Sequence, residues 1–261
     1  MVINNHSNTD SNLRQLLDIK LLAQPFGGAE GQITLEQAKL IAEVYNRIDQ
    51  CTCVLSDLKS RKSYIYYSAL AARLGIEQRE LEIDSIWEDA LLSRMHPKDV
   101  QAKYRLELQY FQLLSAVPVA ERGNYEVITG LRARDEQGKF VKLKHRLLYI
   151  SSADDGSVSL ALCLYYLVYD HPGHGVPEGV IVNRKTGLVI GYDEEQFNRL
   201  LSPRELQVLQ LIKAGLRSKE IADKLLLSIN TVNRHRQNIL KKLNVTNAME
   251  ACSVAVVTGL V

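Results

Sequence analysis

The polar side chains of residues 230–243 have a spacing that suits contact with nucleic acid. Asn233, Arg234 and Gln237 fall on one side of a predicted helix, while apolar residues recur on the other side. A period near that of one helical turn indicates an amphipathic helix. A guanidinium matches the two acceptors on the edge of guanine, and a carboxamide matches the donor–acceptor edge of adenine. The spacing therefore predicts a helix whose outer face could read base edges.

A second short helix comes before this one and determines how it is presented. Residues 219–225 are amphipathic, with Ser218 as the expected N-cap, and Ser228 is the expected N-cap of the longer helix. Only Leu226 and Leu227 separate the two helices. Two helices joined by so short a connection, the second one polar on its outer face, form the helix-turn-helix pattern.

Five segments of this C-terminal part carry a family resemblance. They are LSPRE at 201–205, VLQLI at 208–212, GLRSKEIADKL at 215–225, TVNRH at 231–235 and ILKKLNV at 239–245. Together they resemble the LuxR/GerE-type DNA-binding domain of bacterial transcription regulators. The sequence departs from that family at Leu226, where Gly is usual, and at Asn233, where many members have Lys. A β-carbon at position 226 is tolerable if the turn is not left-handed.

The resemblance implies a capped all-α domain of four helices at 201–261, whose recognition helix is 230–243. Ser202, Pro203 and Glu205 form a helix start, and Gly215 ends that helix. The family's base-contacting positions fall on Asn233, Arg234 and Gln237. Phosphate contacts are expected from Lys219, Thr231, His235, Arg236, Asn238 and Lys241. Two of these have alternatives: Arg236 stands where many members bury Val, so its stem could pack and its head reach solvent, and His235 could equally be a half-buried helix residue.

The family usually acts as a dimer, and this gives the fourth helix a second role. Its small residues would permit close approach of a partner, although burial against their own domain is the alternative for part of the stripe. The partners implied are double-stranded DNA, a second copy of the chain and RNA polymerase. The predicted dimer contacts are Ala251, Val254, Ala255 and Thr258.

The charge distribution supports a polyanion-binding C-terminal part. The chain as a whole has a net charge of +2, but residues 202–247 hold nine Lys or Arg and three Asp or Glu, giving +6. The remainder holds 23 bases and 27 acids, giving −4. A basic module on a mildly acidic body is typical of a nucleic-acid-binding domain attached to a regulatory part.

The preceding residues predict an α+β domain at 46–170. Two strand candidates, 52–57 and 63–67, are followed by short helices and by a long helix at 100–117. Three further strands, joined by turns that contain Gly138 and Gly156, are expected at 125–134, 140–151 and 157–169. Residues 1–45 form a predicted helical extension with helices at 13–22 and 34–48, and 171–200 a linker with a small hairpin.

This element order and three segments resemble a PAS domain. The segments are SDLKSRKSYIYYS at 56–68, HPKDV at 96–100 and GLRARDEQGKFVKLKHR at 130–146. The resemblance implies an antiparallel sheet with helices that binds a small molecule or pairs with another such domain. Haem through His96 is conceivable, but His-Pro-x-Asp recurs in PAS sequences without haem. We expect no cofactor, while haem and flavin stay open. The candidate pocket residues are Tyr67, Trp87, Met95, Tyr104 and His145.

Several other classes find no support in the sequence. The cysteines form no CxxC pair, and no His cluster accompanies them, so we expect no metal and reduced, buried thiols. No apolar stretch predicts a membrane span, and the N-terminus lacks the apolar core of a signal peptide, so a cytoplasmic protein is expected. GxSxG, GxxxxGK[ST] and HExxH are absent, which argues against an enzyme. The alternatives are a sigma-factor-like RNA polymerase subunit and a PAS-based protein-interaction module.

Overall fold

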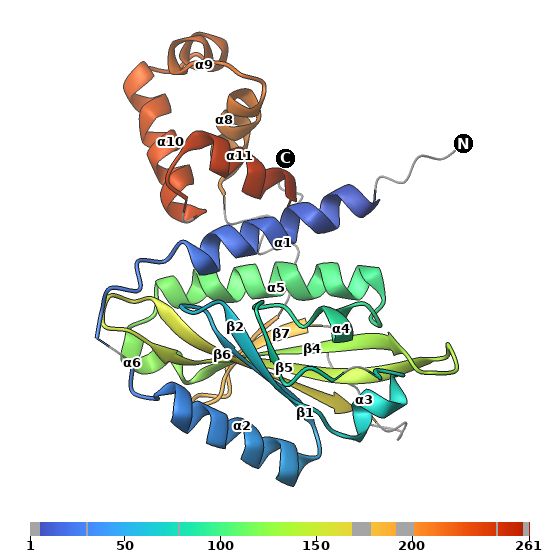
Figure 1. The fold of residues 1–261 in the computed structure, drawn as a ribbon. Helices are drawn as coiled ribbons and strands as arrows, with labels where there is room; N and C mark the ends of the chain where they lie inside the picture. The colour runs from blue at the N-terminus through green and yellow to red at the C-terminus, as the bar shows by residue number, and fades with distance from the viewer. Residues whose placement is uncertain are drawn as a thin grey trace. The chain divides into compact units, whose positions relative to one another are not determined.

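The chain divides into two compact units, and each is considered by itself. The computed structural model describes residues 6–29, 31–77, 79–168, 179–191, 201–243, 245–257 and 261. One unit, residues 17–192, is built around a sheet, and we call it the sheet domain. The other holds residues 193–261 together with 1–16, and its four C-terminal helices form what we call the helical domain (Figure 1). The predicted α+β fold class is confirmed.

The sheet domain contains an antiparallel sheet of eight strands. Their order is β3-β2-β1-β6-β5-β4-β7-β8. In β5 the side chains of Leu143, His145 and Leu147 are buried on one face of the sheet, while Lys142 is exposed and Leu148 is buried on the other face. The strands are β1 (Thr52–Asp57), β2 (Lys62–Tyr66), β3 (Glu82–Ile83), β4 (Tyr125–Arg134), β5 (Phe140–Ser152), β6 (Val158–Leu167), β7 (Gly179–Asn183) and β8 (Val189–Gly191).

The predicted elements 52–57 and 125–134 match β1 and β4 residue for residue, but two domain boundaries are wrong. The hairpin β7–β8, predicted to lie in a linker at 171–200, extends the sheet because β7 pairs with β4 from Tyr125↔Asn183 to Thr129↔Gly179. The helix predicted at 34–48 belongs to the sheet domain as well, because it packs on β1, β2 and β6. The sheet therefore reaches beyond residue 170, and its covering helices begin before residue 46.

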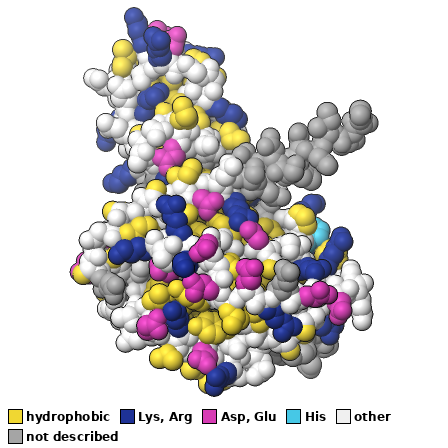
Figure 2. Space-filling view, in the orientation of Figure 1, with side chains coloured by type: hydrophobic (Ala, Val, Ile, Leu, Met, Phe, Trp, Pro, Cys, Tyr) yellow, Lys and Arg dark blue, Asp and Glu magenta, His cyan; other side chains and the backbone are white. Residues whose placement is uncertain are grey.

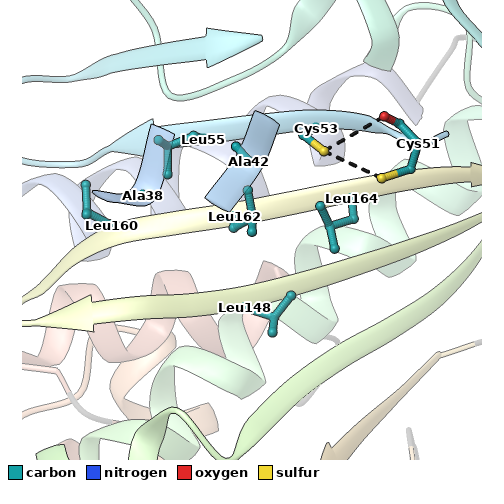
Figure 3. Packing of buried hydrophobic residues seen from close by; sticks show 9 residues of the cluster. All are labelled: Ala38, Ala42, Cys51, Cys53, Leu55, Leu148, Leu160, Leu162 and Leu164. Carbon is teal, nitrogen blue, oxygen red and sulfur yellow. Dashed lines mark hydrogen bonds between the residues drawn. The ribbon is translucent and has the colours of Figure 1, made fainter. Parts of the chain in front are cut away.

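One face of the sheet is covered by α2 (Leu35–Asp49). Its N-cap, Thr34, accepts a hydrogen bond from the Gln37 amide, and the Gln37 side chain returns one to the Thr34 amide, which is the predicted capping box. Ala38 and Ala42 are fully buried, and such small side chains let the helix approach the strands closely. They lie against a purely apolar layer (Figure 3) formed by Cys51, Cys53, Leu55, Leu148, Leu160, Leu162 and Leu164.

The opposite face is covered by α5 (Pro97–Ser115), which packs on β4 and β7. The helix begins three residues before the predicted start at 100, because Pro97 occupies its first turn and the His96 imidazole accepts a hydrogen bond from the Lys98 amide. The remaining helices are α1 (His6–Leu22), α3 (Ala69–Arg73), α4 (Asp89–Leu92) and α6 (Val119–Arg122).

The helical domain has the four helices that the capping signals predict. Ser202 caps the first through the Glu205 amide, and Gly215, with φ +85°, follows its end. Asn247 accepts from the Glu250 amide at the start of the fourth. The expected N-cap of the second was wrong: Arg217 holds that position, and its amide donates to Glu220. The helices are α8 (Pro203–Lys213), α9 (Ser218–Leu225), α10 (Ile229–Lys242) and α11 (Ala248–Val257).

Two further features of the fold are the state of the cysteines and the composition of the helices. All four cysteines are free thiols; Cys51, Cys53 and Cys163 are buried and Cys252 is half-buried, as predicted. None of the helices in the described ranges combines the length and apolar composition that a membrane span needs.

Candidate nucleic-acid interface and a buried polar cluster

The connection between α9 and α10 contains a residue in the left-handed conformation. Leu226 has φ 55° and ψ 47°, and its side chain is 92% exposed. The Leu227 amide donates to the Ala222 carbonyl at 2.9 Å, and Ser228 Oγ accepts from the Thr231 amide at 3.0 Å. The turn is thus of the kind in which a β-carbon is strained, and Leu occupies it all the same.

The outer face of α10 carries the three predicted base-reading residues. Asn233, Arg234 and Gln237 are exposed, and no described residue forms a hydrogen bond or ion pair with them. The inner stripe of the helix is Val232, Ile239 and Leu243, which are buried against the rest of the helical domain. The predicted orientation of the helix is confirmed at the level of exposure, and the three side chains are available to an external partner.

The six residues predicted to contact phosphates fall into two groups. Lys219, Asn238 and Lys241 are exposed. Thr231, His235 and Arg236 are half-buried. Thr231 Oγ1 lies 2.8 Å from Ser228 Oγ, and His235 Nδ1 is buried without a partner among the described residues. Arg236 lies close to Cys252 of α11, where its charge opposes the rise in the pKa of the Cys252 thiol that burial causes. Arg236 and His235 are therefore partly packed against their own domain, which agrees with the alternatives of a packed Arg236 stem and a half-buried His235.

A neighbouring lysine is already occupied within the domain. Lys242 Nζ lies 2.7 Å from Glu205 Oε2, the carboxylate that also accepts from the Ser202 amide. Burial opposes ionisation of Glu205, but these contacts hold its pKa below the usual value. Lys242 thus joins α10 to the start of α8. On the face that Figure 2 shows, other Lys and Arg side chains are spread over the surface of the helical domain.

The predicted dimer contacts of the fourth helix are wrong for three residues. Ala251, Val254 and Ala255 have at most 1% of their surface exposed, and α11 packs on α8 and α10. Their small size serves the core of the chain and leaves no free surface for a partner. Thr258 lies outside the described residues. Among the described side chains of α11, Met249 and Val256 are large, apolar and exposed.

The sheet domain holds a cluster of ionisable groups beneath α5. Lys103 Nζ is 2.5 Å from Glu107 Oε1 and 3.9 Å from Glu88 Oε1, and all three side chains are buried. The hydroxyl of Tyr165 donates to Glu88. Burial by itself would lower the pKa of Lys103, but the two carboxylates hold it above its usual value, so the ammonium stays charged. A buried charge group of this kind is destabilising unless its members are matched to one another.

Two further chemistry-bearing side chains join this cluster from the strands. His145 is fully buried, and neither ring nitrogen has a hydrogen-bond partner among the described residues. Burial, with Lys103 adding to it, keeps the pKa of His145 well below its usual value, so the imidazole is neutral. Burial likewise raises the pKa of the Cys163 thiol. A cavity of about 30 Å³, room for a water molecule, is lined in part by Glu107, Cys163 and Trp87.

Of the five predicted pocket residues, the structure brings three to this place. Trp87 lines the cavity and packs edge-on against Tyr104 at 5.2 Å, and Lys103 lies over both rings. His145 belongs to the cluster itself. The other two residues lie elsewhere. Tyr67 follows β2 with its ring near Arg79 and Glu80, and Met95 forms an isolated β-bridge with Ala133 of β4.

The haem ligand considered from the sequence is elsewhere as well. His96 caps α5 and lies beside Arg132 and Asp99, whose side chains are bound to one another at 2.6 Å. The cluster residues that sequence reasoning missed are Lys103, Glu107, Glu88 and Cys163. Lys and Glu four apart on a helix usually indicate a solvated face, so the sequence carries no signal for this site, and the burial of Lys103 and Glu107 becomes evident only in the structure.

Comparison with known proteins concerns the helical domain. Residues 199–255 match the family "Bacterial regulatory proteins, luxR family". "Oxygen regulatory protein NreC" of Staphylococcus carnosus is 46% identical over 57 residues, which are 22% of this chain and 26% of the relative. "Fimbriae Z protein" of Escherichia coli K12 is 46% identical over 56 residues, 22% of this chain and 27% of the relative. The chain thus matches only about a quarter of the length of these curated relatives.

A comparison of folds reaches further along the chain but is weaker. A solved structure of the Vibrio cholerae VqmA dimer, described in connection with LuxR-type receptors, is 16% identical and covers 87% of this chain and 89% of its own, with a TM-score of 0.31. A superposition of that quality establishes no shared fold. The family match and the four capped helices agree on one conclusion: the chain carries a luxR-family helix-turn-helix domain at residues 199–255.

Proposed function

We propose that this protein is a sequence-specific DNA-binding transcriptional regulator. The observation that carries the proposal is the row Asn233, Arg234 and Gln237, exposed and unengaged by described residues on the second helix of a helix-turn-helix. In that arrangement α10 enters the major groove, Arg234 donates to guanine, and the two carboxamides pair with adenine edges. The net charge of +6 over residues 202–247 favours a polyanion as the partner.

Phosphate contacts come from the exposed members of the predicted set. Lys219 lies at the start of α9, and Asn238 and Lys241 lie along the outer side of α10, so they flank the base-reading row. Contacts of this kind fix register and carry no sequence information. His235 and Arg236 contribute less in this proposal, because both are half-buried, and Thr231 acts with its backbone at the start of the helix.

The sheet domain is proposed to regulate DNA binding. Its element order, with two strands, short helices and then three antiparallel strands, is that of the predicted PAS-like sensor. A buried imidazole without partners among the described residues, beside a cavity, is the kind of feature that ligand sites show. A small ligand taken up by the sheet domain, or a partner on the domain surface, would bias the active form. RNA polymerase is the further partner that such a regulator would meet.

Dimerisation is proposed through α2 rather than α11. Leu40, Val44 and Ile48 recur every four residues on its outer side and are 63%, 54% and 76% exposed. An apolar stripe of this length on a soluble domain indicates a contact surface, and hydrophobic side chains reach the surface in this region (Figure 2). A single helix-turn-helix makes few base contacts, so two copies on adjacent half-sites would supply the affinity.

The test is a genome-wide footprint with the purified full-length chain in the absence of RNA polymerase. We expect protection of discrete sites that weakens as salt is raised. Protection that required core RNA polymerase would instead favour a sigma-factor-like subunit. A chain without any salt-sensitive DNA binding would be a protein-interaction module, and the proposal would be wrong. Repeating the footprint with candidate ligands tests the regulatory role of the sheet domain separately.

A further inference from the structure

Three side chains from separate elements bring metal-ligand atoms together in the core of the sheet domain. Glu107 comes from α5, His145 from β5 and Cys163 from β6, and their ligand atoms all lie within 4.8 Å of one another. Their side chains are 4%, 0% and 8% exposed. We propose that these three residues bind one thiophilic divalent metal ion, with Zn²⁺ as the ion whose ligand preferences they fit. This set of one carboxylate, one imidazole and one thiolate is of the mixed type that Zn²⁺ accepts.

The strand register explains why the ligands converge although they are distant in sequence. Leu147 of β5 pairs with Cys163 of β6, and Tyr165 pairs with His145. Paired residues share a face of the sheet, and so do residues two apart, so His145 and Cys163 both point toward the face that α5 covers. Glu107 is on the buried side of α5. A metal signature based on local spacing is absent for this reason.

The unpartnered imidazole is the independent observation that points to a ligand. A buried polar group that makes no hydrogen bond is destabilising, and His145 has two such nitrogens. Coordination would satisfy one of them. A second unpartnered group lies in the same core: Thr129 pairs with His145 across β4 and β5, so the two side chains share a face of the sheet, and the buried Thr129 hydroxyl has no partner among the described residues. In the metal-bound form, a hydrogen bond from the remaining N–H of His145 to the Thr129 hydroxyl would orient the ring, as outer partners of metal-bound histidines do.

The charges around the site favour a cation. Glu88 and Glu107 bring two negative charges and Lys103 one positive charge into a buried region, which leaves an excess of one negative charge. Binding of the ion displaces the proton of Cys163 to solvent, so the thiolate adds a second negative charge and the divalent ion compensates both. Lys103 contacts one oxygen of Glu107 and leaves the other for the metal. The adjoining cavity of about 30 Å³, which Glu107 and Cys163 line, gives a water room at the fourth position.

The experiment uses the full-length metal-free chain titrated with Co²⁺, followed by displacement with Zn²⁺. Co²⁺ is a spectroscopic substitute for Zn²⁺, and a thiolate ligand gives it an intense near-ultraviolet charge-transfer band. We expect one equivalent of Co²⁺ to bind with this band and Zn²⁺ to abolish it. Cys163→Ala should lose the band and weaken binding by at least ~100-fold, and Thr129→Val should weaken it by roughly 10- to 100-fold while the band is kept.

The matched control is Cys53→Ala, which removes another buried thiol on the opposite face of the same sheet and should keep the band. This control matters because Cys51 and Cys53 have sulfur atoms 3.5 Å apart and could bind a thiophilic ion adventitiously. A band lost in Cys53→Ala and kept in Cys163→Ala would overturn the assignment. If Cys163→Ala did not fold, the titration of Cys53→Ala would still decide: a stoichiometric thiolate band that persists without Cys53 supports the site, and a band that is absent there overturns it. No DNA is present in these measurements, so the outcome is independent of the proposed DNA-binding function.

Discussion

At the scale of single residues, substitutions of the base-contacting and of the phosphate-contacting side chains of α10 should change DNA binding in different ways. Arg234→Ala removes a donor pair for a base edge, so it should weaken operator binding by about 1–3 kcal/mol and relax sequence preference at one position. Lys241→Ala removes a phosphate contact, so it should weaken operator and unrelated duplex alike and flatten the salt dependence. Equilibrium binding to both duplexes over a salt series separates the two effects. Normal operator binding by Arg234→Ala would mean that the face of α10 that meets DNA is assigned wrongly.

A second residue-scale prediction concerns acid stability of the sheet domain. Asp155 accepts hydrogen bonds from the amides of Ser157, Gly27 and Gly28, at 2.8, 2.9 and 2.9 Å. The bond from Ser157 contributes most to lowering the carboxyl pKa from 3.8 to about 2. Because the folded pKa is depressed, the stabilisation is fully present above 3.8 and is lost as the pH falls through about 2.

The urea midpoint of the sheet domain should therefore fall more steeply with acid in the wild type than in Asp155→Asn over that interval. Trp87 is the only tryptophan of the chain, and its fluorescence reports this domain alone. The neighbouring exposed Asp154→Asn serves as the control and should follow the wild type. Equal slopes for all three proteins would show that the loop contacts of Asp155 do not contribute to folding.

The residues that sequence could identify are those whose role follows from their own helix. Asn233, Arg234 and Gln237 needed only the helical period and the caps to be placed on the outer face. Lys103 and Glu107 could not be found in this way, because the strands beneath α5, β5 and β6 among them, impose the burial of these two side chains. Charge on a helix indicates solvent unless the tertiary contacts are known.

At the scale of elements, the left-handed turn before α10 gives a stability prediction. A Leu in this conformation is disfavoured by about 1–2 kcal/mol, and replacing it with Gly would relieve that strain. Part of the relief is offset because Gly has greater conformational freedom in the unfolded chain. Leu226→Gly should therefore raise the free energy of unfolding of the helical domain by roughly 0.5–1 kcal/mol. Leu226 is 92% exposed, so little apolar burial is lost.

Urea unfolding followed by circular dichroism measures the helical transition, and Trp87 fluorescence should report an unchanged sheet domain. Leu226→Ala is the matched control, since it shortens the side chain and keeps the β-carbon, and it should show no comparable gain. A Gly variant no more stable than the Ala variant would argue that position 226 is not held left-handed in solution.

Local signals were enough for most elements and failed where pairing at long range decides. The turn glycines at 138 and 156 and the capping boxes at 34 and 202 indicated where strands and helices begin and end. The hairpin β7–β8 was predicted as a hairpin, but its place beside β4 was not, because a strand's neighbour depends on the whole sheet. The start of α5 was missed because imidazole is an unusual cap.

At the scale of the whole molecule, the sequence correctly predicted a basic helix-turn-helix part and an α+β part. The prediction that small residues of the fourth helix contact a second copy was wrong. Ala251, Val254 and Ala255 looked available for a partner, since small side chains serve close packing within a chain and between chains equally well. Only the contacts of α11 with α8 and α10 distinguish the two uses. The surface for a partner is accordingly proposed on α2, where large apolar side chains remain exposed.

That proposal gives a prediction for the assembly state. Leu40→Glu with Val44→Glu places charges in the middle of the α2 stripe, so an apolar interface between two copies should dissociate. We expect sedimentation to change from dimer to monomer, and operator affinity to fall because two half-sites are no longer joined in one particle. Leu188→Glu, on an apolar residue that is 57% exposed in the β7–β8 hairpin, is the matched control and should leave the dimer intact. Trp87 fluorescence verifies that the double variant is folded. If it sedimented like the wild type, α2 would not be the dimer surface, and a dimer would have to form through other exposed parts of the chain.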